Sequence, residues 1–262
     1  MSTRWLTISI VCLLVLLPGV RLLAAQQDDP RLGSPRPDQA EQLLAMANRA
    51  RAEAGAGPLV WDAALAAAAM AHCRRMVLES QLEHRYPGEL DLASRASHAA
   101  ARFSVIEENL AEAPTAAELH EAWMNSPAHR TNLLNPAVNR VGIAILARSG
   151  ELYAVADYAQ WVSSLDPAQV EQQVASLVEL SGVKVAGGSA AARQACAMEH
   201  GLPAGSAATF VMRWQGADLE HLPGALVQRL ASGRYHLAEI GSCPAQSLGS
   251  PFAAYRLAAL LF

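Results

Sequence analysis

Hydrogen-bonding side chains are concentrated in one short stretch of this chain, AWMNSPAHRTNLLNP at residues 122–136. His129, Arg130 and Asn132 follow the sequence Asn-Ser-Pro within it. Such a run either forms a binding site or ends a helix whose polar groups are satisfied locally. We interpret Asn125, Arg130 and Asn132 as side chains that fix a loop by hydrogen bonds, rather than as ligand contacts.

Histidines are the other candidates for acid–base or metal chemistry. His84 and His129 lie 45 positions apart, so no helical motif such as H-E-x-x-H brings them together, and only the fold can do so. His72 lies beside Cys73, but no second His/Cys pair follows at a matching spacing, so we expect a packing or capping role for it. We assign no role to His98, His120, His200, His221 and His236.

The composition of the 262 residues is that of a folded protein with one large domain or two ordinary ones. About half of the residues are apolar (52%), and the formal net charge is −4. No basic run or interleaved aromatic stripe occurs, so we expect no nucleic-acid partner.

The N-terminus has the layout of a secretory signal peptide over residues 1–25. Arg4 precedes an apolar run from Leu6 to Leu17, and cleavage is expected after Ala25. The apolar run is too short for a membrane anchor, and Arg21 follows it closely. We therefore expect a secreted or periplasmic protein with no transmembrane segment after cleavage, and a polar, proline-containing linker at residues 26–37.

Removal of this segment leaves three cysteines in an oxidising compartment. We favour a disulfide between Cys196 and Cys243, which both lie in the C-terminal third, although the sequence leaves other pairings open. Cys73 lies in an apolar helical run and is expected to be a buried free thiol.

The region from 38 to 164 predicts helices followed by a β-hairpin. Asp38 and Glu41 form a capping-box pattern, a second helix begins at Asp62, and a third begins at Thr115 and ends near Ser126. Residues 81–105 are expected to form a loop with short helical pieces. The runs VGIAILAR and LYAVADYAQW, joined through Ser-Gly, predict the hairpin.

Residues 165–262 predict a smaller α+β domain of unknown role. Helices are expected near 168–180, 193–199 and 223–231, and strands near 209–214, 235–240 and 252–260. The segment 182–188 is glycine-rich but lacks the Lys and hydroxyl of a phosphate-binding loop, so we expect a flexible connector.

The order of features from residue 40 to 161 resembles the CAP superfamily, also called the SCP domain, and most closely its bacterial secreted members. The matching pieces are LLAMANRARAEAGAGPLVWDAALAAAAMAHCRRM, LEHRYPGE, EENLAEA, AWMNSPAHRTNLLNP and VNRVGIAILARSGELYAVADYAQ. The resemblance implies an α-β-α sandwich at residues 38–164, which agrees with the elements expected above.

The resemblance also implies a cleft in which two histidines and two acidic residues converge. His84, Glu108 and His129 match three of these positions, and we expect them as a metal site, with zinc as the cofactor. Ser126 stands where the fuller family site has its second carboxylate. The alternative is a buried hydrogen-bond network that braces the loops against the sheet.

The function expected from this resemblance is that of a secreted, non-enzymatic binding module for a lipid-like or cell-envelope ligand at the His/Glu cleft. The alternative is a metal-dependent hydrolase acting on extracellular peptide or cell-wall material. We assign no catalytic residue, favour binding over catalysis, and leave the protein partner open.

Overall fold

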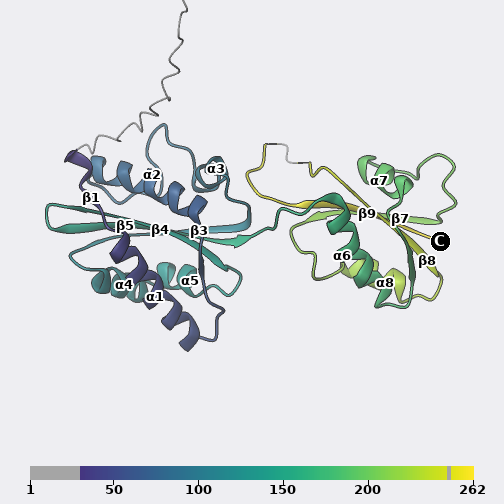
Figure 1. The fold of residues 1–262 in the computed structure, drawn as a ribbon, viewed down its shortest axis with the longest axis horizontal. Coiled ribbons are helices and arrows are strands. Elements are labelled where there is room, and N and C mark those ends of the chain that lie inside the picture. The colour runs from purple at the N-terminus through teal and green to yellow at the C-terminus, as the bar shows by residue number, and fades with distance from the viewer. Residues whose placement is uncertain (1–29, 247–248) are drawn as a thin grey trace, which may run out of the picture.

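The computed structural model describes residues 30–246 and 249–262, which form two lobes that follow one another in sequence (Figure 1). The predicted signal peptide lies outside the described residues. Each lobe has its own sheet, one with β1 to β5 and one with β6 to β9. The architecture is α+β, as predicted.

The N-terminal lobe is an α-β-α sandwich. Its strands are β1 (Ser34–Pro35), β2 (Val60–Trp61), β3 (Phe103–Ala113), β4 (Arg140–Arg148) and β5 (Glu151–Trp161), in the order β1-β4-β5-β3 with β2 paired to β4. The helices α2 (Ala63–Glu79) and α3 (Leu92–His98) cover one face. The other face carries α1 (Pro37–Glu53), α4 (Ala116–Asn125) and α5 (Pro127–Leu134) (Figure 1).

The predicted hairpin is confirmed. Strands β4 and β5 pair antiparallel, and Ser149 and Gly150 both adopt positive φ angles, 55° and 89°, in the turn between them. The prediction missed β3, because its sequence FSVIEENLAEA contains three glutamates and lacks a clean alternation. As a result, a central part of the site lies on a strand that the sequence did not indicate.

The helices predicted to start at Asp62 and Thr115 do so, and both residues are N-caps. Asp62 and Thr115 accept the backbone N–H groups of Leu65 and Glu118. The capping box at Asp38 is wrong: α1 begins at Pro37, and Asp38 instead forms an ion pair with Arg36 at 2.8 Å. Proline suits the first helical position, because its missing N–H has no partner there in any case.

The segment after Ser126 is a second helix, not the predicted loop. Pro127 ends α4 and at the same time opens α5 at its first position. The end of α5 is held by the fully buried Arg51 of α1, which donates to the carbonyl oxygens of Leu133 (2.8 Å), Asn135 (2.9 Å) and Val138 (2.9 Å). Arg51 thus satisfies carbonyl groups that a buried helix end would leave without partners.

The stretch predicted as a linker is only partly one. Its described residues include a short 3-10 helix, Pro30–Leu32, and strand β1, which pairs with β4 through Ser34 and Ala147. Gly33 makes this possible, because a Cβ there would lie 2.1 Å from the carbonyl oxygen of Ala147. The prediction is therefore corrected for residues 30–35.

The C-terminal lobe has helices on both faces of a four-stranded sheet. Its strands β6 (Lys184–Ala186), β7 (Phe210–Gly216), β8 (Leu237–Cys243) and β9 (Tyr255–Leu261) follow the order β6-β8-β9-β7. The helices α6 (Pro167–Glu179) and α8 (Gly224–Leu230) cover one face and α7 (Ala190–Ala197) covers the other (Figure 1). The prediction of a flexible connector at residues 182–188 is wrong, because this glycine-rich segment contains β6, which pairs parallel with β8.

The predicted disulfide between Cys196 and Cys243 is confirmed, with 5.8 Å between the Cα atoms. It ties α7 to the end of β8 within the C-terminal lobe. Cys73 is a buried free thiol, as predicted, and lies in the N-terminal lobe. Burial raises the pKa of this thiol to about 12.

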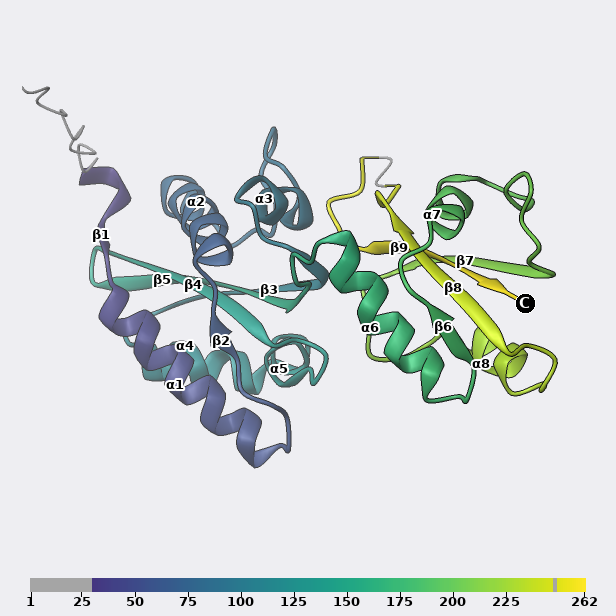
Figure 2. The same ribbon diagram turned by 45° about the vertical axis from the view of Figure 1, so that its right-hand side comes forward.

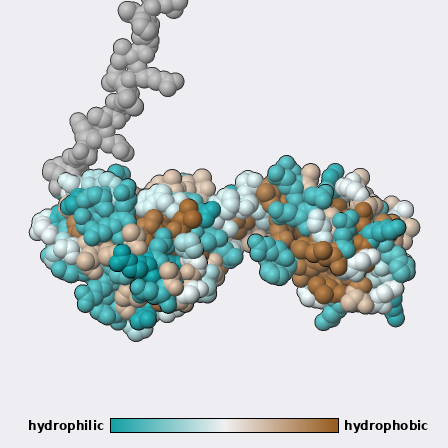
Figure 3. Space-filling view, turned by 60° about the horizontal axis from the view of Figure 1, so that its bottom comes forward, coloured by the Kyte–Doolittle hydropathy of each residue, from teal (hydrophilic) through white to brown (hydrophobic). Residues whose placement is uncertain are grey.

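A narrow neck joins the two lobes (Figure 3). Residues 162–166 connect β5 to α6, which begins at this junction (Figure 2). The hydroxyl of Tyr255 donates to the carbonyl oxygen of Ser163 at 2.6 Å, and the backbone N–H of Ala253 donates to the carbonyl oxygen of Phe103 at 2.8 Å. The rings of Phe103 and Phe252 meet edge to face, with 5.4 Å between centroids.

Among the described residues, no helix is long and apolar enough to cross a membrane.

Candidate functional site

Successive side chains of strand β3 point to opposite faces of the sheet. Glu108 points toward the α2 and α3 layer, where it meets His84 and Arg95. Asn109 points toward α5, where its amide donates to the backbone carbonyl of His129 at 2.9 Å. Because β3 is the last strand of its sheet, groups from both layers approach one another around this edge.

The carboxylate of Glu108 is held on both oxygens. Its Oε1 atom lies 2.8 Å from Nδ1 of His84, and its Oε2 atom accepts from the guanidinium of Arg95. The side chains of Glu108 and Arg95 are only 2% and 5% exposed, whereas that of His84 is 61% exposed. The pair therefore consists of a buried carboxylate and an imidazole that reaches solvent.

His72 and Glu89 extend this cluster inward. His72 is fully buried, with Nδ1 at 2.7 Å from Oε1 of Glu89 and Nε2 at 2.9 Å from the carbonyl oxygen of Glu83. Its Nε2 atom also lies 4.0 Å from Glu108 Oε2. The expectation of a packing role for His72 is confirmed, since both ring nitrogens have partners inside the protein.

Asp157 on β5 is the cross-strand neighbour of Glu108 and is completely buried. Neither of its oxygens has a hydrogen-bond partner among the described residues. Burial and the negative charge of Glu108 raise the pKa of Asp157 well above its ordinary value. A protonated Asp157 carboxyl is thereby favoured, and it can donate to the carboxylate of Glu108.

His129 lies on α5, in the opposite helical layer from His84. Burial and the charge of His84 lower the pKa of His129, while the bond to Glu108 raises the pKa of His84. The structure thus brings His84 and Glu108 into contact and places His129 within electrostatic range of them. The imidazole of His129 has no hydrogen bond or ion pair to either residue in the described part of the chain.

The N-terminal lobe matches a known family over most of its length. Residues 44–158 match the model of the cysteine-rich secretory protein family, CAP. This part of the chain is a CAP domain. The protein YkwD of Bacillus subtilis is 27% identical over 114 residues, which are 43% of this chain and 44% of that protein. The chain thus spans less than half the length of this curated relative.

Two solved structures resemble about half of the chain. An outer surface protein from Borrelia burgdorferi is 19% identical, with a TM-score of 0.46 over 49% of this chain and 98% of that one. An extracellular protein containing a SCP domain from Bacillus anthracis is 22% identical, with a TM-score of 0.44 over 47% of this chain and 41% of that one.

The polar stretch at residues 122–136 of the CAP domain is fixed by amide side chains. Asn132 donates to the carbonyl oxygen of Glu108 at 3.2 Å and to the side chain of Asn109 at 3.0 Å. Its predicted loop-fixing role is confirmed. The side chains of Asn125 and Arg130 make no such bonds within residues 30–246 and 249–262, so the same prediction is not supported for them.

The donor set in the CAP domain does not fit zinc in the arrangement observed. The guanidinium of Arg95 occupies Oε2 of Glu108, and His84 directs Nδ1 at the other oxygen. In the part of the chain that the structure describes, no group of three or more His, Cys, Asp or Glu side chains is arranged to hold a metal ion. Zinc binding by His84, Glu108 and His129 stays a prediction.

The sequence did not single out Glu89, Arg95 or Asp157 as members of this cluster. Arg95 lies in the region expected to be a loop, and no local pattern marked it. Asp157 left a clearer signal, since it is a single acid in the otherwise apolar run LYAVADYAQW. An acidic side chain at a position that faces the core requires a partner or a raised pKa.

Proposed function

We propose that this protein is a secreted binding module whose CAP domain holds a lipid-like or cell-envelope ligand at His84. The imidazole of His84 carries the proposal. Its Nδ1 atom is fixed by Glu108, and its Nε2 atom has no partner among the described residues, while the side chain is 61% exposed. A fixed, solvent-facing hydrogen-bonding atom is suited to the polar head group of a ligand.

The electrostatics of the pair favour an anionic head group. Because the bond to Glu108 raises the pKa of His84, the imidazolium form persists closer to neutral pH, where its Nε2–H can donate to a phosphate oxygen. The neighbouring His129 has a lowered pKa and so stays neutral in the same range. This leaves His84 as the cationic member of the two histidines.

The same contacts argue for binding rather than hydrolysis. A general base needs a free lone pair directed at substrate, but both oxygens of Glu108 face side chains of the protein. Ser126, which lies between α4 and α5, has no carboxyl group and so cannot supply a second acid. The metal-dependent hydrolase therefore receives no support from an observed contact.

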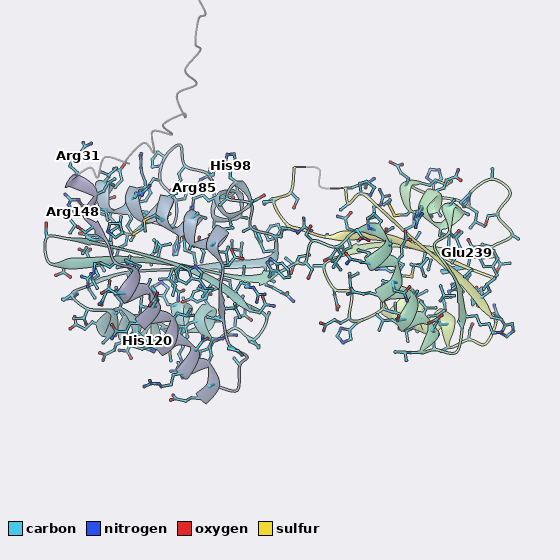
Figure 4. The ribbon with its side chains drawn as sticks, viewed as in Figure 1. Arg31, Arg85, His98, His120, Arg148 and Glu239 are labelled. Carbon is cyan, nitrogen blue, oxygen red and sulfur yellow. A yellow bond between two sulfur atoms is a disulfide. The ribbon has the colours of Figure 1, made fainter. Side chains whose placement is uncertain are left out.

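The first prediction concerns vesicles of phosphatidylglycerol. We expect the full chain to sediment with them, and we expect His84→Ala to weaken binding about tenfold or more, because a hydrogen bond to a charged group contributes roughly 1.5–3 kcal/mol. His98→Ala is the matched control. His98 is an exposed histidine on α3, in the same layer of the CAP domain (Figure 4).

Equal binding by wild type and His84→Ala would contradict the proposal, as would equal binding to phosphatidylcholine vesicles. Repeating the wild-type measurement in EDTA separates the alternative function. If the chelator abolishes vesicle binding, a metal ion rather than the imidazole holds the ligand.

A further inference from the structure

A cavity lies at the junction of the lobes, outside the region in which His84 and Glu108 meet. Its volume is about 560 Å³, within the range of roughly 300–1,000 Å³ typical of small-molecule sites. The end of β5, the connector, α6 and the segment after β7 line it. Most of its lining follows residue 158, where the match to the CAP family ends.

The walls of this cavity are held in place by contacts between the lobes. Tyr255, which lines the cavity, donates to the carbonyl of Ser163 at 2.6 Å. On the CAP side, Arg102 donates to the carbonyl oxygens of Val162 and Ser163, each at 3.3 Å. The cavity is therefore preformed, which lowers the entropy lost when a ligand binds.

Trp161 supplies an aromatic surface in this cavity. Its side chain is 38% exposed, and its backbone N–H donates to the side chain of Asn139 at 3.0 Å. The guanidinium of Arg140 lies over the indole, 5.2 Å from the ring centroid. Arg140 does not line the cavity, whereas Trp161 does.

Polar side chains with unused hydrogen-bonding capacity surround this ring. Asp218 accepts the backbone N–H of Glu220 at 2.7 Å and lies 3.0 Å from Nδ1 of His221, which orders that loop. Among the described residues, no protein group bonds the carboxylate of Glu220, the side-chain amide of Gln173 or the indole N–H of Trp161. Both donors and acceptors are thus available.

The charges of the lining select against anions. Asp218 and Glu220 face the cavity, and its lining includes no lysine or arginine. The carboxylates of Asp218 and Glu220 would repel a phosphate or sulfate group, and the nearby guanidinium of Arg140 is stacked on Trp161 outside the lining. A ligand with hydroxyl and amide groups would match the amide and carboxylate side chains without an electrostatic penalty.

We propose that this cavity binds a short, uncharged or N-acetylated oligosaccharide, with one pyranose ring stacked on Trp161. A pyranose has an apolar C–H face, which packs on an aromatic ring, and a rim of hydroxyl groups, which bond to planar amides and carboxylates. The cavity provides both kinds of surface side by side. This site is independent of the one at His84.

The test uses the full chain and two probes, the tetramer of N-acetylglucosamine and the tetramer of glucose, in titration calorimetry. We expect at least one of them to bind, Trp161→Ala to weaken binding at least tenfold, and Trp161→Phe to retain part of the affinity. Trp61→Ala is the control, because Trp61 is also exposed, at 41%, but lies on β2 and does not line the cavity.

Gln173→Ala and Glu220→Ala keep the proposal testable if Trp161→Ala fails to fold. Their side chains make no bond within the described residues, so each is expected to lower affinity severalfold without loss of folding. Failure of both tetramers to bind overturns the proposal, as does equal weakening by Trp61→Ala. Binding of a trilysine peptide in place of either saccharide also overturns it.

Discussion

At the scale of single residues, the CAP site contains two carboxyl groups buried side by side, those of Glu108 and Asp157. Glu108 and Asp157 are neighbours on adjacent strands, and only Glu108 has a cationic partner, Arg95. Two buried carboxylates side by side cannot both ionise at low cost, so the one without a cation retains its proton. The environment thus gives two similar side chains different roles.

Substitution of the two acids by their amides is predicted to have opposite effects. Asp157→Asn replaces a neutral carboxyl by a neutral amide, so we expect stability equal to or above that of wild type at pH 7. Glu108→Gln removes the carboxylate that binds buried Arg95 directly and leaves it only Glu89, at 4.0 Å, which we expect to cost about 3 kcal/mol. Urea unfolding of both variants measures this.

Glu121→Gln, at an exposed position on α4, controls for the change of an acid to an amide. If Asp157→Asn were as damaging as Glu108→Gln, Asp157 would have to be charged in the folded protein.

At the scale of elements, the position of α2 on the sheet depends on one glycine. A Cβ at Gly142 would lie 2.0 Å from the backbone N of Ala66 and 2.2 Å from the carbonyl carbon of Leu65. Gly142 is also the β4 partner of Asp157. The helix that carries His72 can therefore approach the strands that carry the acids only because this position has no side chain.

Gly142→Ala is predicted to push α2 away from the sheet. We expect a loss of about 3 kcal/mol or more, because the clash is with backbone and the core has no room to absorb it. Gly57→Ala is the control, since a Cβ there meets nothing within 4 Å. Thermal unfolding compares the two, and equal melting temperatures would show that α2 can shift without cost.

Much of this architecture could be predicted from the sequence, and the failures have physical causes. The hairpin and α2 were predictable because their periodicity and end signals agree. Strand β3 was not, because Glu107 and Glu108 serve contacts on both faces of the sheet edge and so break the apolar pattern. The His84–Glu108 contact depends on pairing across 24 residues, which only the family resemblance indicated.

At the scale of the whole molecule, the lobes have separate hydrophobic cores. The clusters of the CAP domain and those of the C-terminal lobe share no buried residue. In the C-terminal lobe, Glu171 binds Arg193 through two bonds of 2.8 and 2.7 Å and accepts the N–H of Ser242 at 2.9 Å. Each lobe therefore has its own source of stability.

Acidification is predicted to loosen the C-terminal lobe. Burial disfavours the charge on Glu171, but the bonds from Arg193 and Ser242 outweigh it and lower the pKa of this carboxyl. The unfolded chain then takes up the proton first as the pH falls below about 4.5, so stability declines from there toward the lower folded-state pKa. Hydrogen exchange at α6 and β8 between pH 6 and 3 measures this.

Glu171→Gln should be less protected at pH 6 but show a flatter pH dependence, whereas Glu179→Gln, at an exposed position of the same helix, should behave as wild type. A Glu171→Gln variant with the same pH dependence as wild type would rule this carboxyl out as the acid-sensitive group.

The distribution of the thiols between the lobes affects oxidative maturation. The three cysteines among the described residues allow three pairings, yet Cys73 belongs to the lobe that is synthesised first, and its burial removes it from solvent once that lobe has folded. With its pKa raised to about 12, it forms almost no thiolate, which is the form that attacks a disulfide. Among the described residues, Cys196 and Cys243 then remain to react, so the order of synthesis favours the native bond without the help of a reshuffling enzyme.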